Sequence, residues 1–144
     1  MSVLTARRCL FASPVNAATS ADSPPTTAAN VAEACRCCAE ACHRVLTDPA
    51  SRLDDRGVTD RGAPERLVPR LLLQECRDLC RVTASILSRP TTTAPAICQA
   101  CSDACSRVLQ HADLGRRSSV EREVSMCRSL CLSMADGHHS AIKD

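Results

Sequence analysis

Ten of the twelve cysteines follow one spacing pattern, which occurs twice along the chain. Each copy is Cys-x2-Cys-x3-Cys followed by a more distant Cys-x3-Cys, and together they comprise Cys35, Cys38, Cys42, Cys76, Cys80, Cys98, Cys101, Cys105, Cys127 and Cys131. Residues three and four apart share one face of an α-helix. Thiolates are soft donors that select Cu(I), zinc and iron–sulfur clusters. The spacing therefore predicts stripes of thiols on helices, suited to holding a soft metal ion between them.

The text around these cysteines is also duplicated. Residues 34–46 read ACRCCAEACHRVL and align with ICQACSDACSRVL at 97–109, while ECRDLC at 75–80 aligns with MCRSLC at 126–131. One helical hairpin cannot bury its own inner face, so two paired copies are the simplest account. The sequence thus predicts an all-α fold, an antiparallel up-down-up-down four-helix bundle built from a duplicated helical hairpin.

Start and stop residues set the expected bounds of the four helices, which are 31–46, 65–88, 94–112 and 119–135. Asn30 and Glu33 have the spacing of a capping box at the first helix, and Asp48 precedes a proline that ends it. Pro69 either kinks the second helix or marks its true start. The cysteine stripes should all face the interior of this bundle.

Three segments are expected along the chain: a disordered leader or targeting segment at 1–29, the cysteine-lined bundle at 30–136, and a polar tail at 137–144. Arg7 and Arg8 in the leader resemble a weak twin-arginine export signal, so export is the alternative to a cytoplasmic location. Cys9 lies in this leader, and Cys37 lies 200° around the first helix from Cys35. We expect both Cys9 and Cys37 to lie outside the thiol core.

Composition excludes several classes of function. The net charge is only +2, and the chain contains one Phe, no Trp and no Tyr. Nucleic-acid binding has no basic run or stacking residues to support it, no apolar stretch approaches the roughly 20 residues that span a membrane, and no catalytic constellation indicates an enzyme. Large core residues are scarce, and an empty cavity costs about 24 cal/mol per Å³, so bound metal would relieve an underfilled interior.

The ordered cysteine set, with CAEAC at 38–42 and CSDAC at 101–105, resembles the bacterial four-helix-bundle copper storage proteins. The resemblance implies that the ten repeated cysteines hold several Cu(I) ions per chain. It also implies exchange of copper with a copper chaperone or a recipient cuproenzyme. Self-association into a homo-oligomer is left open by the sequence.

Two alternatives remain open at this stage. The cysteines could form disulfides between helices in a stapled interaction scaffold, as in small intermembrane chaperones with twin Cys-x3-Cys hairpins, although those lack the additional upstream cysteine of each copy. The cysteines could instead bind zinc, although structural zinc takes four ligands per site and ten aligned positions exceed two such sites.

The two ends of the bundle are expected to differ. One end carries an apolar plug of Val45, Leu46, Leu72, Leu73, Val108, Leu109 and Val124. Met134 lies on the inner face of the last helix at the other end, and His138 and His139 follow it. A thioether and imidazoles are exchangeable contacts for Cu(I), so we expect these three residues to line the mouth through which metal enters. His43 and His111 are expected to be solvated residues near helix ends.

Overall fold

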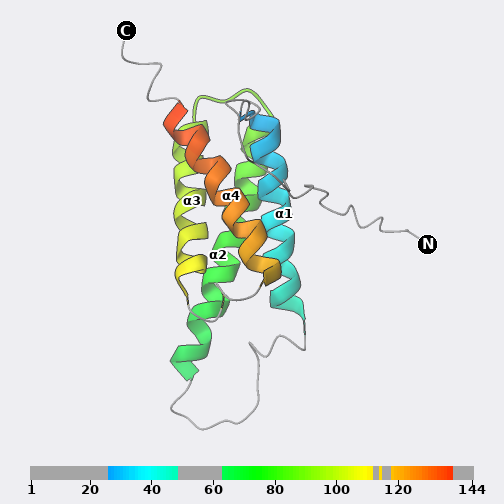
Figure 1. The fold of residues 1–144 in the computed structure, drawn as a ribbon, viewed down its shortest axis with the longest axis vertical. Coiled ribbons are helices and arrows are strands. Elements are labelled where there is room, and N and C mark those ends of the chain that lie inside the picture. Colours follow the sequence, from blue (N-terminus) through cyan, green and yellow to red (C-terminus); the bar gives the residue numbers. More distant parts are fainter. Residues whose placement is uncertain (1–25, 49–62, 112–113, 115–117, 138–144) are drawn as a thin grey trace, which may run out of the picture.

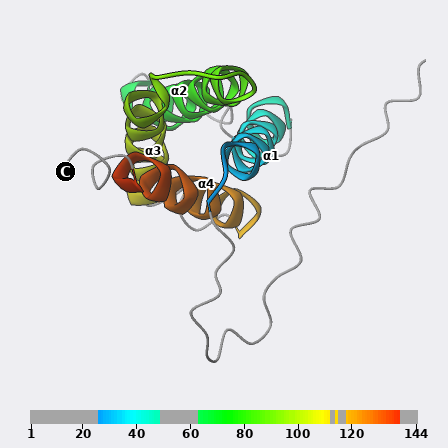
Figure 2. The ribbon, with the colours of Figure 1, turned by 90° about the horizontal axis from the view of Figure 1, so that it is seen from above.

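The computed structural model describes residues 26–48, 63–111, 114 and 118–137. These residues form four α-helices and no strand: α1 (Ala28–Thr47), α2 (Ala63–Leu87), α3 (Ala94–Gln110) and α4 (Ser118–Gly137). Successive helices run in opposite directions (Figure 1) and follow each other around a ring (Figure 2), so each packs against two neighbours. The predicted up-down-up-down bundle is confirmed. The leader up to residue 25, the linker at 49–62 and the tail from 138 lie outside the described residues.

The first helix begins earlier than the sequence predicted. Thr27 has extended backbone angles (φ −94°, ψ 153°), and its side-chain oxygen accepts a hydrogen bond of 3.2 Å from the backbone N–H of Asn30. The prediction of Asn30 as the cap is therefore wrong. Two alanines follow Thr27, and alanine has the best intrinsic helix propensity, so the helix extends by most of a turn. Its end at Thr47, before the predicted stop at Asp48, is confirmed.

Pro69 lies inside α2 and does not mark its start. The first turns of α2 project beyond the rest of the bundle (Figure 1), which leaves Leu67, Val68 and Leu71 about half exposed, at 48–53%. Leu73, one turn after Pro69, is fully buried. The proline therefore stands where α2 passes from solvent into the bundle.

A layer of large apolar side chains closes the end of the bundle where α1 and α3 finish. Five side chains there have no exposed surface, and we call them the apolar end: Leu73, Val108, Leu114, Val120 and Val124. The other predicted plug residues join them, since Val45 and Leu46 are buried and Leu72 and Leu109 pack against the core in part. Leu114 and Val120 were not predicted. The backbone N–H of Leu114 donates to the carbonyl of His111 (3.1 Å), and this turn directs Leu114 inward.

The opposite end, where α4 finishes, is closed by smaller side chains. We call it the mixed end; it consists of Val31, Thr83, Leu87, Ala94 and Ala135, with Met134 packed partly against them. Thr83 and Ser102 are the only buried polar side chains other than cysteine among the described residues. Their hydroxyls donate to the carbonyls of Leu79 (2.7 Å) and Gln99 (2.8 Å) within their own helices.

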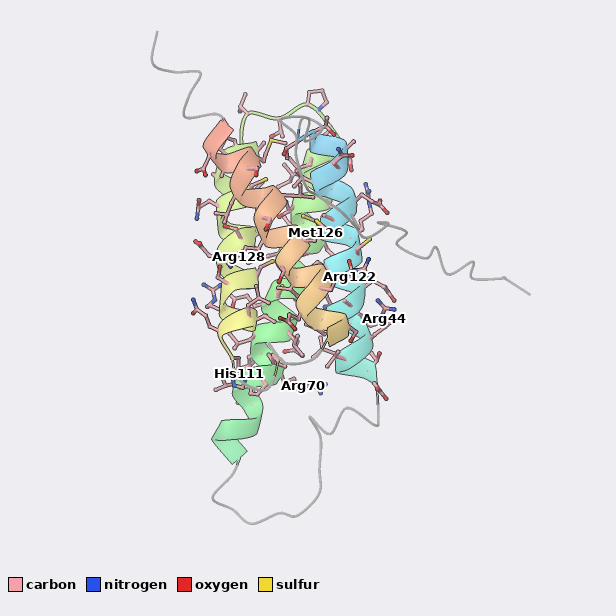
Figure 3. All side chains as sticks on the ribbon, viewed as in Figure 1. Arg44, Arg70, His111, Arg122, Met126 and Arg128 are labelled. Atoms are coloured by element: carbon pink, nitrogen blue, oxygen red, sulfur yellow. The ribbon has the colours of Figure 1, made fainter. Side chains whose placement is uncertain are left out.

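Charged side chains are kept on the outside of the bundle. Arg44 of α1 and Arg122 and Arg128 of α4 lie on outer faces (Figure 3) and are exposed. Between α2 and α3, Arg107 forms an ion pair of 2.8 Å with Glu75, both about half exposed. No Lys, Arg, Asp or Glu is buried among the described residues. The interior therefore has no fixed charge with which to balance an ion or a thiolate.

Candidate metal centre

The middle of the bundle is lined by the ten repeated cysteines, which we call the thiol column. Three come from α1, two from α2, three from α3 and two from α4, each with 0% exposure. All ten are free thiols. The predicted inward direction of the four stripes is confirmed, because cysteines three and four apart occupy one face of each helix.

At the centre of the column, sulfur atoms from three helices meet at one level. The Sγ of Cys80 lies 3.6 Å from that of Cys101 and 3.8 Å from that of Cys127. Cys101 and Cys127 are 3.9 Å apart. These distances are close to van der Waals contact between sulfur atoms, so a small ion placed among the three would touch all of them.

The column continues in both directions from this level. Toward the mixed end, the Sγ of Cys35 lies 3.6 Å from that of Cys127 and 3.8 Å from that of Cys131. Toward the apolar end, the Sγ of Cys76 in α2 lies 3.8 Å from that of Cys38 in α1 and 3.9 Å from that of Cys105 in α3. The close contacts thus form two groups along the bundle axis, one of five sulfur atoms and one of three. Cys80 links the groups, because its sulfur atom lies within 4.8 Å of those of Cys38, Cys76 and Cys105.

Three groups of four sulfur atoms have all their members within 4.8 Å of one another. One outer tetrad is Cys35, Cys101, Cys127 and Cys131; the other outer tetrad is Cys38, Cys76, Cys80 and Cys105; the central tetrad is Cys80, Cys101, Cys105 and Cys127. Cys42 and Cys98 belong to none of these groups. They lie at the two ends of the column, Cys42 nearer the apolar end and Cys98 nearer the mixed end.

Contacts between neighbouring thiols lower the pKa of some column cysteines and raise the pKa of others. The hydrogen bond with Cys101 raises the pKa of Cys35, but those with Cys127 and other cysteines outweigh it and lower the pKa to about 6. At the end of the column, the hydrogen bond with Cys131 and then burial raise the pKa of Cys98. Hydrogen bonds to a charged group favour its charged form, and the thiolate is the form that binds metal. The same kind of contact raises the pKa of Cys80 and Cys127 at the centre, so thiols that favour the thiolate alternate with thiols that keep their proton.

Cys37 lies outside the tetrads, as its helical phase indicated, but it is not on an exposed face. Only 1% of its surface is accessible, and it is disulfide-bonded. Ala34 and Ala41, one turn before and after it on the same flank, are also buried at 2%. Helical phase separates the stripe from this flank but cannot show that the flank is covered. Cys9 lies outside the described residues.

The histidines and Met134 divide between the two ends. His43 and His111 are only partly exposed, and each has a buried Nδ1 atom without a hydrogen-bond partner among the described residues. The expectation that both are solvated therefore holds only in part, because one ring nitrogen of each is buried. Met134 is partly buried against the core at the mixed end. His138 and His139 lie outside the described residues.

None of the helices in the described part of the chain is long and apolar enough to cross a membrane. Comparison with curated proteins and with solved structures finds no match. A family model described as "Copper storage protein" matches residues 58–140, more than half of the chain, and spans α2, α3 and α4. The segment of α1 that precedes this match repeats the cysteine spacing of α3. The chain therefore belongs to the copper storage protein family.

Proposed function

We propose that this protein stores several Cu(I) ions on the thiolates of its ten column cysteines. One observation supports this most strongly: ten buried free thiols from four helices line one interior, and eight of them have a neighbouring sulfur atom 3.6–3.9 Å away. A single structural metal site needs about four ligands. A column of ten cysteines has ligands for several metal ions, and binding several ions is what distinguishes a storage protein from a protein with one structural metal site.

The chemistry of the donors favours Cu(I). Thiolate is a soft ligand, and a Cu(I) ion is satisfied by two or three sulfur atoms that it shares with neighbouring ions. Two sulfur atoms on either side of one ion are about 4.6 Å apart, twice a metal–sulfur bond of roughly 2.3 Å. Neighbours in the column need only a small outward movement to reach this separation, which rotation of cysteine side chains can supply.

Charge balance also favours a monovalent ion. Burying a charge is costly unless it is paired, and the described interior has no buried Lys, Arg, Asp or Glu. One Cu(I) for each thiolate leaves the column neutral. This supports loading up to about one ion per cysteine.

The alternatives fit less well. A disulfide-stapled scaffold requires bonds between the helices, whereas the ten column cysteines are free thiols. Catalysis requires a nucleophile or acid–base group within reach of a substrate, whereas every column thiol has 0% exposure. We therefore propose residues 30–136 as a storage unit that is not an enzyme and that exchanges copper with a copper chaperone or a recipient cuproenzyme. A cytoplasmic location is proposed, with export as the alternative.

We further propose the mixed end as the route for metal, with Met134, His138 and His139 at its mouth. Support comes from size, because the mixed end is closed partly by alanines, whereas the apolar end is closed by leucines and valines that are 0% exposed. Met134 packs against the core on this side and offers a soft thioether. Cys98 and Cys131 are the column thiols nearest to this end.

An anaerobic Cu(I) titration of the fully reduced protein, in competition with a Cu(I) chelator, tests the storage function. We expect saturation near ten ions per chain, about one for each column cysteine. The matched control is the double variant Cys9→Ser with Cys37→Ser, which should saturate at the same value. Saturation at one or two ions would contradict storage and indicate a discrete metal site.

A further inference from the structure

The tetrads of the thiol column have a geometry that suits a second class of ion. We propose that the two outer tetrads each bind one divalent ion with tetrahedral preference, such as Zn(II) or Cd(II), to a limit of two per chain. This inference uses the same cysteines as Cu(I) storage but does not depend on it, because it rests on how the sulfur atoms are grouped.

The distances between sulfur atoms in each outer tetrad match those around a tetrahedral ion. Four sulfur atoms at bonds of about 2.3 Å around a tetrahedral ion lie about 3.8 Å from one another. In one outer tetrad, Cys35 lies 3.6 Å from Cys127 and 3.8 Å from Cys131. In the other, Cys76 lies 3.8 Å from Cys38. Every pair of sulfur atoms within a tetrad is within 4.8 Å. A tetrahedral ion therefore requires less movement of these atoms than a Cu(I) ion held in line between two of them.

The cysteines that the tetrads share limit the number of ions to two. The central tetrad shares Cys101 and Cys127 with one outer tetrad and Cys80 and Cys105 with the other. An ion in the central tetrad therefore blocks both outer tetrads. The two outer tetrads share no cysteine, so they can be filled together. Two ions then use eight thiols and leave only Cys42 and Cys98 uncoordinated in the column.

A divalent ion in an outer tetrad would also stabilise the folded bundle. Each outer tetrad takes its ligands from three helices: one from α1, α3 and α4, the other from α1, α2 and α3. These ligands converge only in the folded bundle, so the binding energy adds to folding stability. Each M(II) ion that displaces four thiol protons forms M(SR)₄ with a net charge of −2. Because the described interior has no buried cation, we expect Cu(I), which can neutralise each thiolate, to displace the divalent ion.

Co(II) is the probe, since its visible absorption reports tetrahedral sulfur coordination. The reduced Cys9→Ser, Cys37→Ser protein is titrated anaerobically, and we expect saturation at two equivalents. Adding Cys42→Ser and Cys98→Ser should leave two equivalents. Adding Cys127→Ser instead should leave one equivalent. This change removes a ligand from the central tetrad and from the outer tetrad that contains Cys35, but it leaves the outer tetrad that contains Cys38 intact. Adding Cys80→Ser with Cys127→Ser should leave none, since these changes break all three tetrads.

Circular dichroism establishes that each variant is folded. A measurement on the parent protein needs no core substitution: relative to the metal-free protein, two equivalents of Cd(II) should slow the alkylation of the eight tetrad thiols and leave the slow alkylation of Cys42 and Cys98 unchanged, as located by mass spectrometry. Saturation at any number other than two, or loss of an ion through Cys42→Ser with Cys98→Ser, would overturn the proposal. Cu(I) capacity is measured separately, so a poor Cu(I) store that still binds two Co(II) ions would refute storage alone.

Discussion

The thiol column and the apolar end are equally buried, yet they are built for different purposes. Both consist of side chains with 0% exposure. A buried Leu or Val contributes about 1.5–3 kcal/mol to stability, whereas a buried Cys acts as a small hydrophobe whose reactivity is the reason for its presence. The stability of the metal-free fold therefore depends mainly on the ends of the bundle. The middle contributes less packing energy, because its positions are occupied by cysteine ligands instead of larger apolar side chains.

Among single substitutions, damage to the apolar end should cause the largest loss of stability. Replacing Leu73 with Ala removes a fully buried side chain and should lower the free energy of unfolding by about 2–5 kcal/mol. The measurement is urea denaturation of the reduced, metal-free protein. Leu71→Ala is the matched control, because Leu71 is 50% exposed on the same helix and should change stability by about 0.5 kcal/mol or less. Equal losses in both variants would refute the division between the two regions.

Metal should supply to the column the stability that its small side chains lack. The column exists only in the folded protein, so Cu(I) bound there stabilises the folded form. A free ion concentration about 1,000 times the dissociation constant adds roughly 4 kcal/mol per site to the free energy of unfolding. We therefore expect a clear rise in Tm by calorimetry under anaerobic conditions. If Tm stays constant although copper binds, the column is already a complete core without metal.

Single cysteine substitutions should separate the column from its surroundings. Cys101 belongs to two of the three tetrads, so Cys101→Ser should remove at least one Cu(I) ion from the saturated protein. Cys37 belongs to none, and Cys37→Ser should leave saturation unchanged. The readout is copper per folded chain after gel filtration. Comparable losses in the two variants would show that Cys37 contributes a ligand.

The smallest expected effect concerns the rate of metal exchange at the mixed end. Replacing Met134 with Leu, and His138 and His139 with Ala, should slow Cu(I) uptake several-fold and leave the final capacity unaltered, because these groups are exchange contacts. Stopped-flow transfer from a Cu(I) chelator measures the rate. His43→Ala with His111→Ala is the control at the other end. A slower rate in the control, with no change in the first variant, would move the route to the end where α1 and α3 finish.

The sequence by itself determined which ten cysteines face inward, because the helical period is a local property of each segment. It also determined the number of helices and their alternating directions, since the segments are duplicated and the connections from α2 to α3 and from α3 to α4 are short. The stop before Pro49 followed from local stereochemistry in the same way. The start of α1 did not, because Asn30 and Thr27 are both acceptable caps and the helix propensity of two alanines favours the earlier one.

Only the tertiary structure decided which sulfur atoms meet. Phase around a helix assigns Cys101 and Cys127 to inner faces, but their 3.9 Å contact depends on how far α3 and α4 slide along each other. That offset is set by the packing of the side chains between the helices and not by either segment alone. The same reason accounts for Leu114, which a turn carries into the core, and for Cys37, whose flank is buried at 1% exposure. The periodicity of one segment determines which way a side chain points around its own helix axis. The geometry of a metal site depends also on the distances and offsets between several helices.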